Sequence, residues 1–202
     1  MKFALTGSCF AGGFFHLKPG GSEMRIIDSP KEVKNYDCII FVGGEDISPY
    51  LYNQTPLGTH YWNNERDIFE AKCFTEALEN DKIILGICRG HQLINALLLG
   101  SLFQDIWNAG YNNHENKHEI TWNVPKENPL PAIFKRVNSM HHQAVKHSGN
   151  GLVKIAETLD GIIESTIDPR RKILTFQFHP ECLPNTGILN LIANYNKDIW
   201  EI

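Results

Sequence analysis

Apolar and polar residues alternate along this chain with two different periods. Between residues 64 and 80 the apolar side chains recur every three or four positions, as on one face of an amphipathic helix. Short apolar runs rich in β-branched residues surround this stretch, and such runs are typical of buried strands. Strands that alternate with helices indicate an α/β fold with a mostly parallel central sheet flanked by helices. The strands predicted in the first half lie near residues 2–6, 24–27, 38–42 and 82–87.

The second half of the chain contains more strand-like segments and one further helix. A final helix near residues 187–200 is expected to cover the sheet. No internal repeat or low-complexity linker interrupts the 202 residues, a length that suits one well-packed core, so residues 1–202 are predicted to form a single domain. Strands are predicted near residues 118–124, 137–140, 152–157, 162–167 and 173–178.

A glycine-flanked cysteine lies where a predicted strand turns into a helix. Apolar residues recur on one helical face after Cys88, and Gly100 is a natural stop for that helix. Gly86 and Gly90 complete a Gly-x-Cys-x-Gly pattern, the cysteine version of a nucleophile elbow. Glycines suit its strained turn, and a helix N-terminus favours a thiolate. A buried core cysteine is the alternative, which the paired glycines disfavour.

A second candidate group follows another strand. The run that ends at Phe178 alternates like a half-buried strand and leads into His179, Pro180 and Glu181. Residues two apart in an extended chain point the same way, so His179 and Glu181 are expected to share one side of the strand end. This arrangement suits a base that takes the Cys88 proton and a carboxylate that fixes its tautomer.

These segments are predicted to meet at one edge of the sheet. In open α/β sheets, sites form beyond the carboxyl ends of the strands. The GGED sequence at residues 43–46, Cys88 and the His179 segment all follow predicted strands. Three distant parts of the chain therefore point to one site.

Several motifs together resemble the class I glutamine amidotransferase-like superfamily, and within it the stand-alone γ-glutamyl hydrolases. The resemblance spans residues 38–181, most of the chain, whereas residues 7–30 are short, glycine-rich and unlike the family pattern. It implies a flavodoxin-like α/β fold with Cys88 as nucleophile, His179 as base and Glu181 as orienting residue. The motifs are GICRGHQ and LINALLLGSLFQDI at residues 86–106, NSMHHQAV at 138–145, DGIIES at 160–165 and FQFHPE at 176–181.

The resemblance also implies how a substrate is held. The sequence FVGGEDISP at residues 41–49 is similar to the family's oxyanion loop, which implies an oxyanion hole made by the backbone N–H groups of Gly44 and Arg89. The NSMHHQ segment is similar to the part of the family that lines the γ-glutamyl pocket. The expected substrate-binding residues are Gln92, Asn138, Ser139, Met140, His141 and His142. For Gln92 a helix-packing role is the alternative. Arg66, Asp67 and Glu70 match a family stretch, but we interpret them as the charged start of a helix.

Charge and cysteine content indicate which binding partners and which cellular compartment to expect. The formal net charge of −4, with no basic run interleaved with aromatic residues, argues against nucleic-acid binding. Five cysteines without a CxxC pair suit a reducing cytoplasm better than a disulfide framework. No apolar run approaches the length of a membrane span. Residues 2–6 fit a first strand better than they fit part of a signal peptide. We expect a cytoplasmic protein that contacts neither nucleic acid nor membrane and leave a homodimer open.

The segment from His114 to His118 has the HExxH pattern of zinc proteases. That motif needs a helix to place both histidines on one face, together with a third ligand. Asparagines precede this segment and strand-like alternation follows it, which disfavours the helix. We therefore expect no metal and no organic cofactor.

The expected reaction is hydrolysis of a small γ-glutamyl amide by Cys88. A γ-glutamyl cytidine-diphosphate amidate, as used in capsule phosphoramidate synthesis, suits aromatic residues that stack on a base and arginines that meet phosphates. The candidates are Tyr61, Trp62 and Trp107 for the base, and Arg89, Arg170 and Arg171 for the phosphates. A γ-glutamyl-γ-aminobutyrate-type hydrolase is one alternative. A glutaminase subunit that delivers ammonia to a synthase partner is another, and a metal-dependent or non-catalytic protein is the third.

Overall fold

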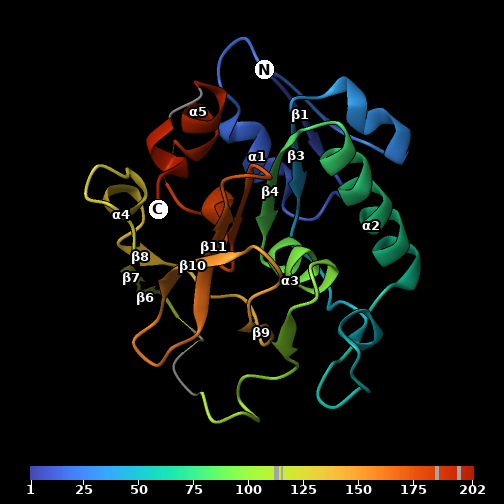
Figure 1. The fold of residues 1–202 in the computed structure, drawn as a ribbon, viewed down its shortest axis with the longest axis vertical. Coiled ribbons are helices and arrows are strands. Elements are labelled where there is room, and N and C mark those ends of the chain that lie inside the picture. Colours follow the sequence, from blue (N-terminus) through green and yellow to red (C-terminus); the bar gives the residue numbers. More distant parts are fainter. Residues whose placement is uncertain (112–113, 115, 185–186, 195–196) are drawn as a thin grey trace.

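An eight-stranded sheet forms the centre of the computed structural model (Figure 1). The structure describes residues 1–111, 114, 116–184, 187–194 and 197–202. The strand order across the sheet is β2-β1-β3-β4-β12-β11-β10-β7. The strands from β2 to β12 pair in parallel and those from β12 to β7 in antiparallel fashion, which confirms the predicted α/β fold with a mostly parallel sheet. These strands are β1 (Lys2–Leu5), β2 (Glu23–Ile26), β3 (Cys38–Phe41), β4 (Ile83–Ile87), β7 (Thr121–Trp122), β10 (Val153–Glu157), β11 (Ile163–Asp168) and β12 (Ile173–Phe176).

Helices and two small sheets surround the central sheet. Two-stranded sheets join β5 (Ser101–Phe103) to β9 (Ala144–His147) and β6 (His118–Glu119) to β8 (Arg136–Val137). The α-helices are α1 (Ala11–Leu17), α2 (Asn64–Glu79), α3 (Arg89–Leu97), α4 (Leu130–Ile133) and α5 (Ile188–Ala193). The short 3₁₀-helices are η1 (Pro30–Asn35), η2 (Pro49–Tyr52), η3 (Pro180–Cys182) and η4 (Lys197–Trp200). None of the helices in the described ranges has the length and apolar composition that crossing a membrane requires.

The sheet separates two hydrophobic cores, because successive strand residues point to opposite faces. Along β3, Cys38 and Ile40 belong to one core, while Ile39 and Phe41 belong to the other. The first core packs α1, α4 and α5 against the sheet, and the second packs α2 and α3. Figure 1 shows α2 and α5 on opposite sides of the sheet, as this division requires.

The elements differ from the sequence-based expectation at several points. The predicted final helix is wrong as one piece, since α5 ends at Ala193 and η4 begins at Lys197, with residues 195–196 outside the described part. The predicted strand near 137–140 is reduced to β8. The helix α3 is buried on all sides from Arg89 to Ala96 and not on one face only, because it lies between the sheet and the surrounding loops. The helix α1 and the strands β5 and β9 were not predicted.

The parallel register brings three strand ends together. Phe41 of β3 lies opposite Gly86 of β4, and Phe176 of β12 lies opposite Ile87. The segments that follow these three neighbouring strands therefore leave the sheet at one edge, as the sequence predicted.

Candidate active site

The turn at Cys88 is a strained strand-to-helix elbow. Cys88 has φ 51° and ψ −104°, a conformation that costs an ordinary residue energy and persists only where the surroundings impose it. Its backbone N–H donates to the carbonyl oxygen of Phe176 at 2.7 Å, which ties the turn to β12. A side chain at Gly90 would collide with the backbone of Phe41, and one at Gly86 with that of Gly90. Both flanking glycines are thus required for close packing.

His179 and Glu181 meet beside this cysteine. His179 Nδ1 lies 2.6 Å from Glu181 Oε1, both side chains are buried, and the imidazole is hydrogen-bonded to the Cys88 side chain. Burial alone would lower the pKa of His179, but the hydrogen bonds and charges of Cys88 and Glu181 raise it to about 10. The arrangement therefore favours a protonated His179 imidazole between the Cys88 side chain and the Glu181 carboxylate.

The route by which Glu181 reaches the imidazole differs from the prediction. His179 is extended, with φ −104° and ψ 90°, but the chain then enters the 3₁₀ turn η3. The expectation of a continuous extended segment was wrong, because the proline starts a turn that folds the carboxylate back onto Nδ1.

The backbone of His179 is held by Asn138. The Asn138 amide donates from Nδ2 to the carbonyl oxygen of His179 at 2.8 Å, and its Oδ1 accepts from the His179 N–H at 2.8 Å. Both ends of this side chain are used within the protein. Asn138, expected to bind substrate, lies where it positions the histidine.

The N-terminal segment covers the same group. The ring of Phe10 lies 4.7 Å from that of His179, between centroids, at an interplanar angle of 57°. A Cβ at Gly13 would lie 2.6 Å from the carbonyl oxygen of Glu181, so α1 packs directly on η3. Sequence reasoning missed these contacts, and the glycine pair at 12–13 was the available signal for close packing.

The GGED loop also approaches the imidazole. A Cβ at Gly43 would lie 2.6 Å from His179 Cε1, so only glycine fits there. Gly44 has φ 154°, in the region that favours glycine. The guanidinium of Arg66 holds this turn by donating to the carbonyl oxygens of Val42 at 3.3 Å and Gly43 at 2.9 Å. Arg89 is the first residue of α3, so its N–H is among those without an intrahelical partner.

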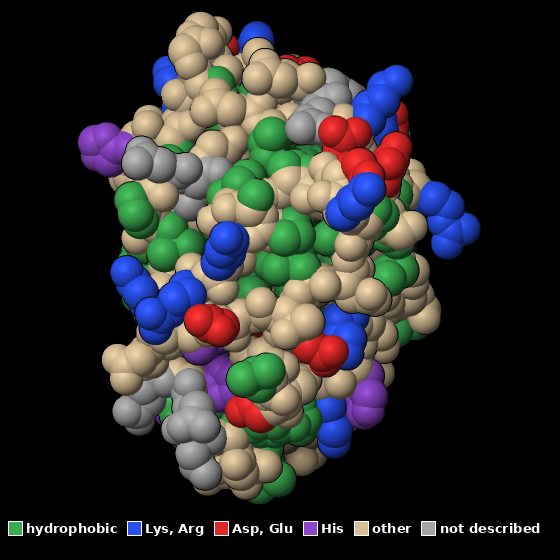
Figure 2. All heavy atoms as spheres, turned by 90° about the vertical axis from the view of Figure 1, so that its left-hand side faces the viewer, with side chains coloured by type: hydrophobic (Ala, Val, Ile, Leu, Met, Phe, Trp, Pro, Cys, Tyr) green, Lys and Arg blue, Asp and Glu red, His purple; other side chains and the backbone are tan. Residues whose placement is uncertain are grey.

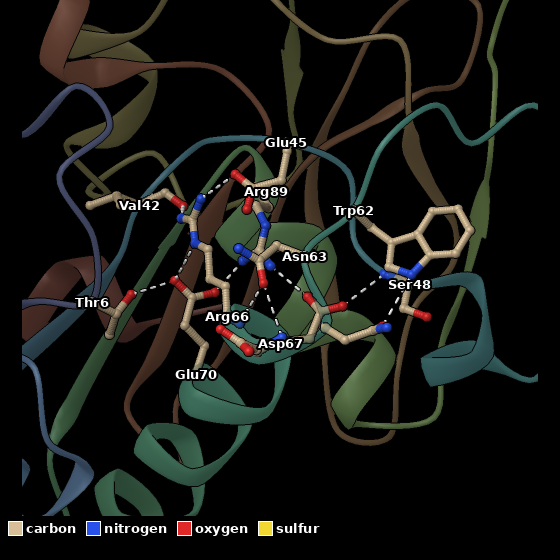
Figure 3. Close-up of polar contacts among 12 residues, drawn as sticks. Thr6, Val42, Glu45, Ser48, Trp62, Asn63, Arg66, Asp67, Glu70 and Arg89 are labelled. Atoms are coloured by element: carbon tan, nitrogen blue, oxygen red, sulfur yellow. Dashed lines mark hydrogen bonds and ion pairs between the residues drawn. The ribbon is translucent and has the colours of Figure 1, made fainter.

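Arg66 belongs to a buried ion network beneath the loop (Figure 3). The Arg89 side chain is fully buried and pairs with Asp67 and Glu70 from α2. Glu70 also pairs with Arg66 at 3.2 Å, which in turn pairs with Glu45 at 2.6 Å. Arg66, Asp67 and Glu70 lie in the first two turns of α2, as our interpretation of a charged helix start expected, and their side chains in addition join α2 to α3 and the GGED loop. The Arg89 side chain is also not available to a phosphate.

Two hydrogen bonds from residues outside the ion pairs extend the same network. Thr6 Oγ1 donates to Glu70 at 2.8 Å, and the Ser48 N–H donates to Asp67 at 3.0 Å. Burial raises the pKa of Asp67 despite the opposing charge of Arg89. The α2 helix starts at this point because Asn63 caps it, accepting from the N–H groups of Glu65 and Arg66.

A pocket of about 470 Å³ is bordered by four of the remaining expected substrate residues, Ser139, Met140, His141 and His142, and not by Gln92. Met140 is half-exposed, and His142 donates from Nε2 to the Asp46 carboxylate of the GGED loop across 2.8 Å. Gln92 is buried and donates to the Gln143 carbonyl oxygen at 3.0 Å. The pocket is lined by His60, Trp107, His114, Ser139, Met140, His141 and His142.

The residues suggested for nucleotide recognition separate into two groups. The Trp107 ring is stacked over that of His142, with centroids 6.2 Å apart, and borders the pocket. Tyr61 is largely exposed. Arg170 and Arg171 follow Asp168, which pairs with the first residue of β12, so they lie at the edge of the sheet opposite to Cys88. The suggested phosphate contacts of these arginines are therefore contradicted.

The histidines of the HExxH pattern come together without a shared helix. His118 begins β6, and residue 115 lies outside the described residues. The rings of His114 and His118 nevertheless lie 5.4 Å apart, and that of His141 lies 6.0 Å from His114. His114 and His141 with Glu164 form a buried group of metal-ligating atoms, and Asp46, His60 and His142 form a more exposed one.

Comparisons with known proteins place the chain among related sequences and folds. The family model described as Peptidase C26 matches residues 16–181. The glutamine amidotransferase-like protein YvdE of Lactococcus lactis is 36% identical over 197 residues, covering 87% of this chain and 78% of that protein. The γ-glutamyl-CDP-amidate hydrolase of Campylobacter jejuni is 28% identical over 144 residues, covering 71% and 62%.

The fold likeness extends to solved structures. A glutamine amidotransferase from Thermotoga maritima superposes with a TM-score of 0.61, covering 97% of this chain and 82% of that one. At 15% sequence identity this comparison concerns the fold alone.

Cys88 is predicted to react with iodoacetamide before Cys9 and Cys182 at neutral pH, although Cys182 is more exposed. Burial raises the pKa of the Cys9 and Cys182 thiols, whereas Cys88 lies beside the His179 imidazole, a base that can take its proton as the sulfur reacts. Peptide mass spectrometry over a labelling time course gives the order. His179→Ala should abolish the preference for Cys88, and faster labelling of Cys182 in the unchanged protein would contradict the assignment.

Arg89→Ala is predicted to lower the free energy of unfolding by about 3–5 kcal/mol, because it leaves buried Asp67 and Glu70 without their shared cation. Urea denaturation measures the loss. Arg25→Ala, which removes an exposed pair with Glu23, is the matched control and should cost less than about 0.5 kcal/mol. Equal losses would show that the network does not stabilise the fold.

Proposed function

Because the chain belongs to the Peptidase C26 family, which supports an enzyme that acts on amide bonds, we propose that it hydrolyses the γ-glutamyl amide of a small compound. The observation that carries this proposal is the strained Cys88 elbow, hydrogen-bonded to a His179 that Glu181 orients. A nucleophile, a base and an orienting carboxylate in this chain of contacts are what acyl transfer requires.

The reaction starts from the thiolate of Cys88. Its sulfur attacks the γ-carbonyl carbon, and the oxygen of the tetrahedral intermediate lies against the N–H groups of Gly44 and Arg89. His179, which holds the thiol proton, gives it to the leaving nitrogen as the C–N bond breaks. Glutamate then remains on Cys88 as a thioester, and the amine departs.

Water completes the cycle. His179 takes a proton from water as the oxygen attacks the thioester carbon, and the C–S bond breaks to release glutamate. The proton stays on His179 opposite the regenerated thiolate, so the resting ion pair is restored. No step in this sequence needs a metal or an organic cofactor.

The leaving group is proposed to occupy the pocket beside Met140 and His142. The stacked rings of Trp107 and His142 and the similarity to the Campylobacter enzyme favour an aromatic or nucleotide amidate as a second candidate. The described pocket lining contains no lysine or arginine, so imidazole and backbone N–H groups would have to meet a diphosphate. A γ-aminobutyrate-type leaving group and a glutaminase subunit with a synthase partner are the alternatives.

The triad roles are tested by substitution and pH. Cys88→Ala should abolish turnover, and His179→Ala should reduce kcat/KM by about 10²–10⁴-fold. Glu181→Gln should cost less, because an amide still holds the imidazole. Since Glu181 raises the pKa of His179, this variant should also move the alkaline limb of the kcat/KM profile to lower pH. Equal losses with an unmoved alkaline limb would contradict the orienting role.

Substrate preference distinguishes the three hypotheses, a nucleotide-amidate hydrolase, a γ-aminobutyrate-type hydrolase and a glutaminase subunit. We expect kcat/KM for γ-glutamyl-γ-aminobutyrate and for a γ-glutamyl nucleotide amidate to exceed that for glutamine, because ammonia leaves the pocket unfilled and forfeits remote binding energy. The isolated chain should turn over without a partner. If glutamine were the best substrate of the three, the hydrolase hypothesis would be rejected in favour of a glutaminase subunit.

A further inference from the structure

Glu164 is a fully buried carboxylate whose nearest polar side chains, among the described residues, are imidazoles. It lies at the start of β11, and neither side-chain oxygen makes a hydrogen bond. Burying an ionised carboxylate without compensation costs several kcal/mol or more. The polar atoms recorded near it belong to imidazoles, with Nε2 of His118 at 3.3 Å and Nε2 of His141 at 3.8 Å from Oε1.

Three histidines turn one ring nitrogen inward at this carboxylate. Nδ1 of His114, Nε2 of His118 and Nε2 of His141 are buried and have no hydrogen-bond partner. The His114, His141 and Glu164 ligand atoms lie within 4.8 Å of one another. They come from a loop, a loop and a strand far apart in the sequence, so their convergence is a property of the fold.

The outward nitrogen of each imidazole is already engaged. Nδ1 of His141 lies 2.9 Å from the Gln143 carbonyl oxygen, and Nδ1 of His118 lies 3.3 Å from that of Asn116. A carbonyl oxygen only accepts, so these Nδ1 atoms carry protons. A neutral His141 ring then presents a lone pair at Nε2, whereas Nε2 of His118 pairs with Glu164 when it also carries a proton. Nε2 of His114 lies 3.1 Å from Asp160, which fixes its proton in the same way.

Inward lone pairs beside a buried carboxylate repel one another unless a cation lies between them. Metal-bound histidines have this pattern, in which the outer N–H donates to a carbonyl or carboxylate and orients the inner nitrogen. Ligand atoms around a tetrahedral zinc ion are about 3.3–3.4 Å apart, given bonds of roughly 2.0–2.1 Å. The His141 contact with Glu164 is within 0.5 Å of this spacing, and the ligand atoms of His114, His141 and Glu164 all lie within 4.8 Å of one another.

We propose that His114, His141 and Glu164 bind one divalent transition-metal ion of the zinc class. Imidazole nitrogens favour such ions over Mg²⁺ or Ca²⁺, which prefer oxygen ligands. Three protein ligands leave the fourth tetrahedral position to water, and His118 lies beside Glu164 without joining the ligand group. The ion lies apart from Cys88 and takes no part in the thioester chemistry.

The site has a definite connection to the catalytic base. His141 belongs to the loop in which Asn138 holds the His179 backbone and Met140 borders the pocket. An ion at His141 fixes the other end of that loop. The cluster opens through a small pocket of about 160 Å³ lined in part by His114, His118 and Asp160. On that face, histidine side chains are set back between acidic and hydrophobic ones in the lower half of Figure 2.

Metal content and affinity of the full-length protein test the proposal without any substrate. The protein is stripped with a chelator, titrated with Zn²⁺, and separately loaded with Co²⁺, whose visible absorption reports tetrahedral coordination. We expect one ion per chain, a tetrahedral Co²⁺ spectrum and a higher thermal midpoint with Zn²⁺. Glu164→Gln and His141→Ala should each weaken Zn²⁺ binding by more than about 100-fold, which exceeds the usual effect of outer residues.

Two further variants keep the test decisive if a ligand variant fails to fold. Asp160→Ala changes a half-exposed residue that only orients His114, and it should weaken Zn²⁺ binding by about 10–100-fold. His60→Ala alters the more exposed Asp46–His60–His142 group, and Cys88→Ala removes the candidate nucleophile. Both should bind Zn²⁺ as the unchanged protein does.

Three results would overturn the site. The first is no stoichiometric Zn²⁺ binding, and the second is binding that is lost in His60→Ala or Cys88→Ala but retained in Glu164→Gln. The third is nitrogen NMR of the chelated protein showing a proton on Nε2 of His141 that Zn²⁺ does not displace. None of these results bears on γ-glutamyl hydrolysis, so the two proposals fail separately.

Discussion

The left-handed backbone of Cys88 is the constraint on which the arrangement of the site depends. A residue in such a conformation costs of order 1–3 kcal/mol and stays there only if its neighbours leave no alternative. Here β12 holds the Cys88 N–H, the backbone of Phe41 packs on Gly90, and the next residue, Arg89, is tied to α2 by buried ion pairs. The strained turn that places the sulfur beyond the end of β4 is thus maintained by three separate elements of the fold.

The ion network explains why the oxyanion loop and the elbow are built together. Arg66 holds the carbonyl oxygens before Gly44, and through Glu70 it shares a carboxylate with Arg89. Truncating Arg89 leaves the buried carboxylate of Asp67 without its cation, so the network is costly to break at that residue. The two backbone N–H groups proposed for the oxyanion are therefore positioned by one buried cluster and not by two independent loops.

The parts of the structure that sequence could predict are those encoded locally. The alternation of apolar residues gave the parallel strands and α2, and Gly86, Cys88 and Gly90 marked the elbow, because these features depend on a few neighbouring residues. The role of Asn138 and the inward turn of Arg89 depend on partners tens of residues away, which spacing does not reveal. The turn at Pro180 shows the same limit, since the extended angle expected before a proline says nothing of where the chain goes after it.

The loop from Asn138 to His142 connects the catalytic base, the proposed substrate pocket and the histidine cluster around Glu164. Its first residue holds the backbone of His179, Met140 and His142 border the pocket proposed for the leaving group, and His141 turns inward to Glu164. A loop of five residues has little packing of its own to hold such a geometry. Its precision has to come from its ends, where Asn138 is fixed by two hydrogen bonds to the strand end and His141 by the buried histidine cluster. Whatever satisfies the charge of Glu164 therefore also determines how rigidly the catalytic base and the substrate pocket are joined.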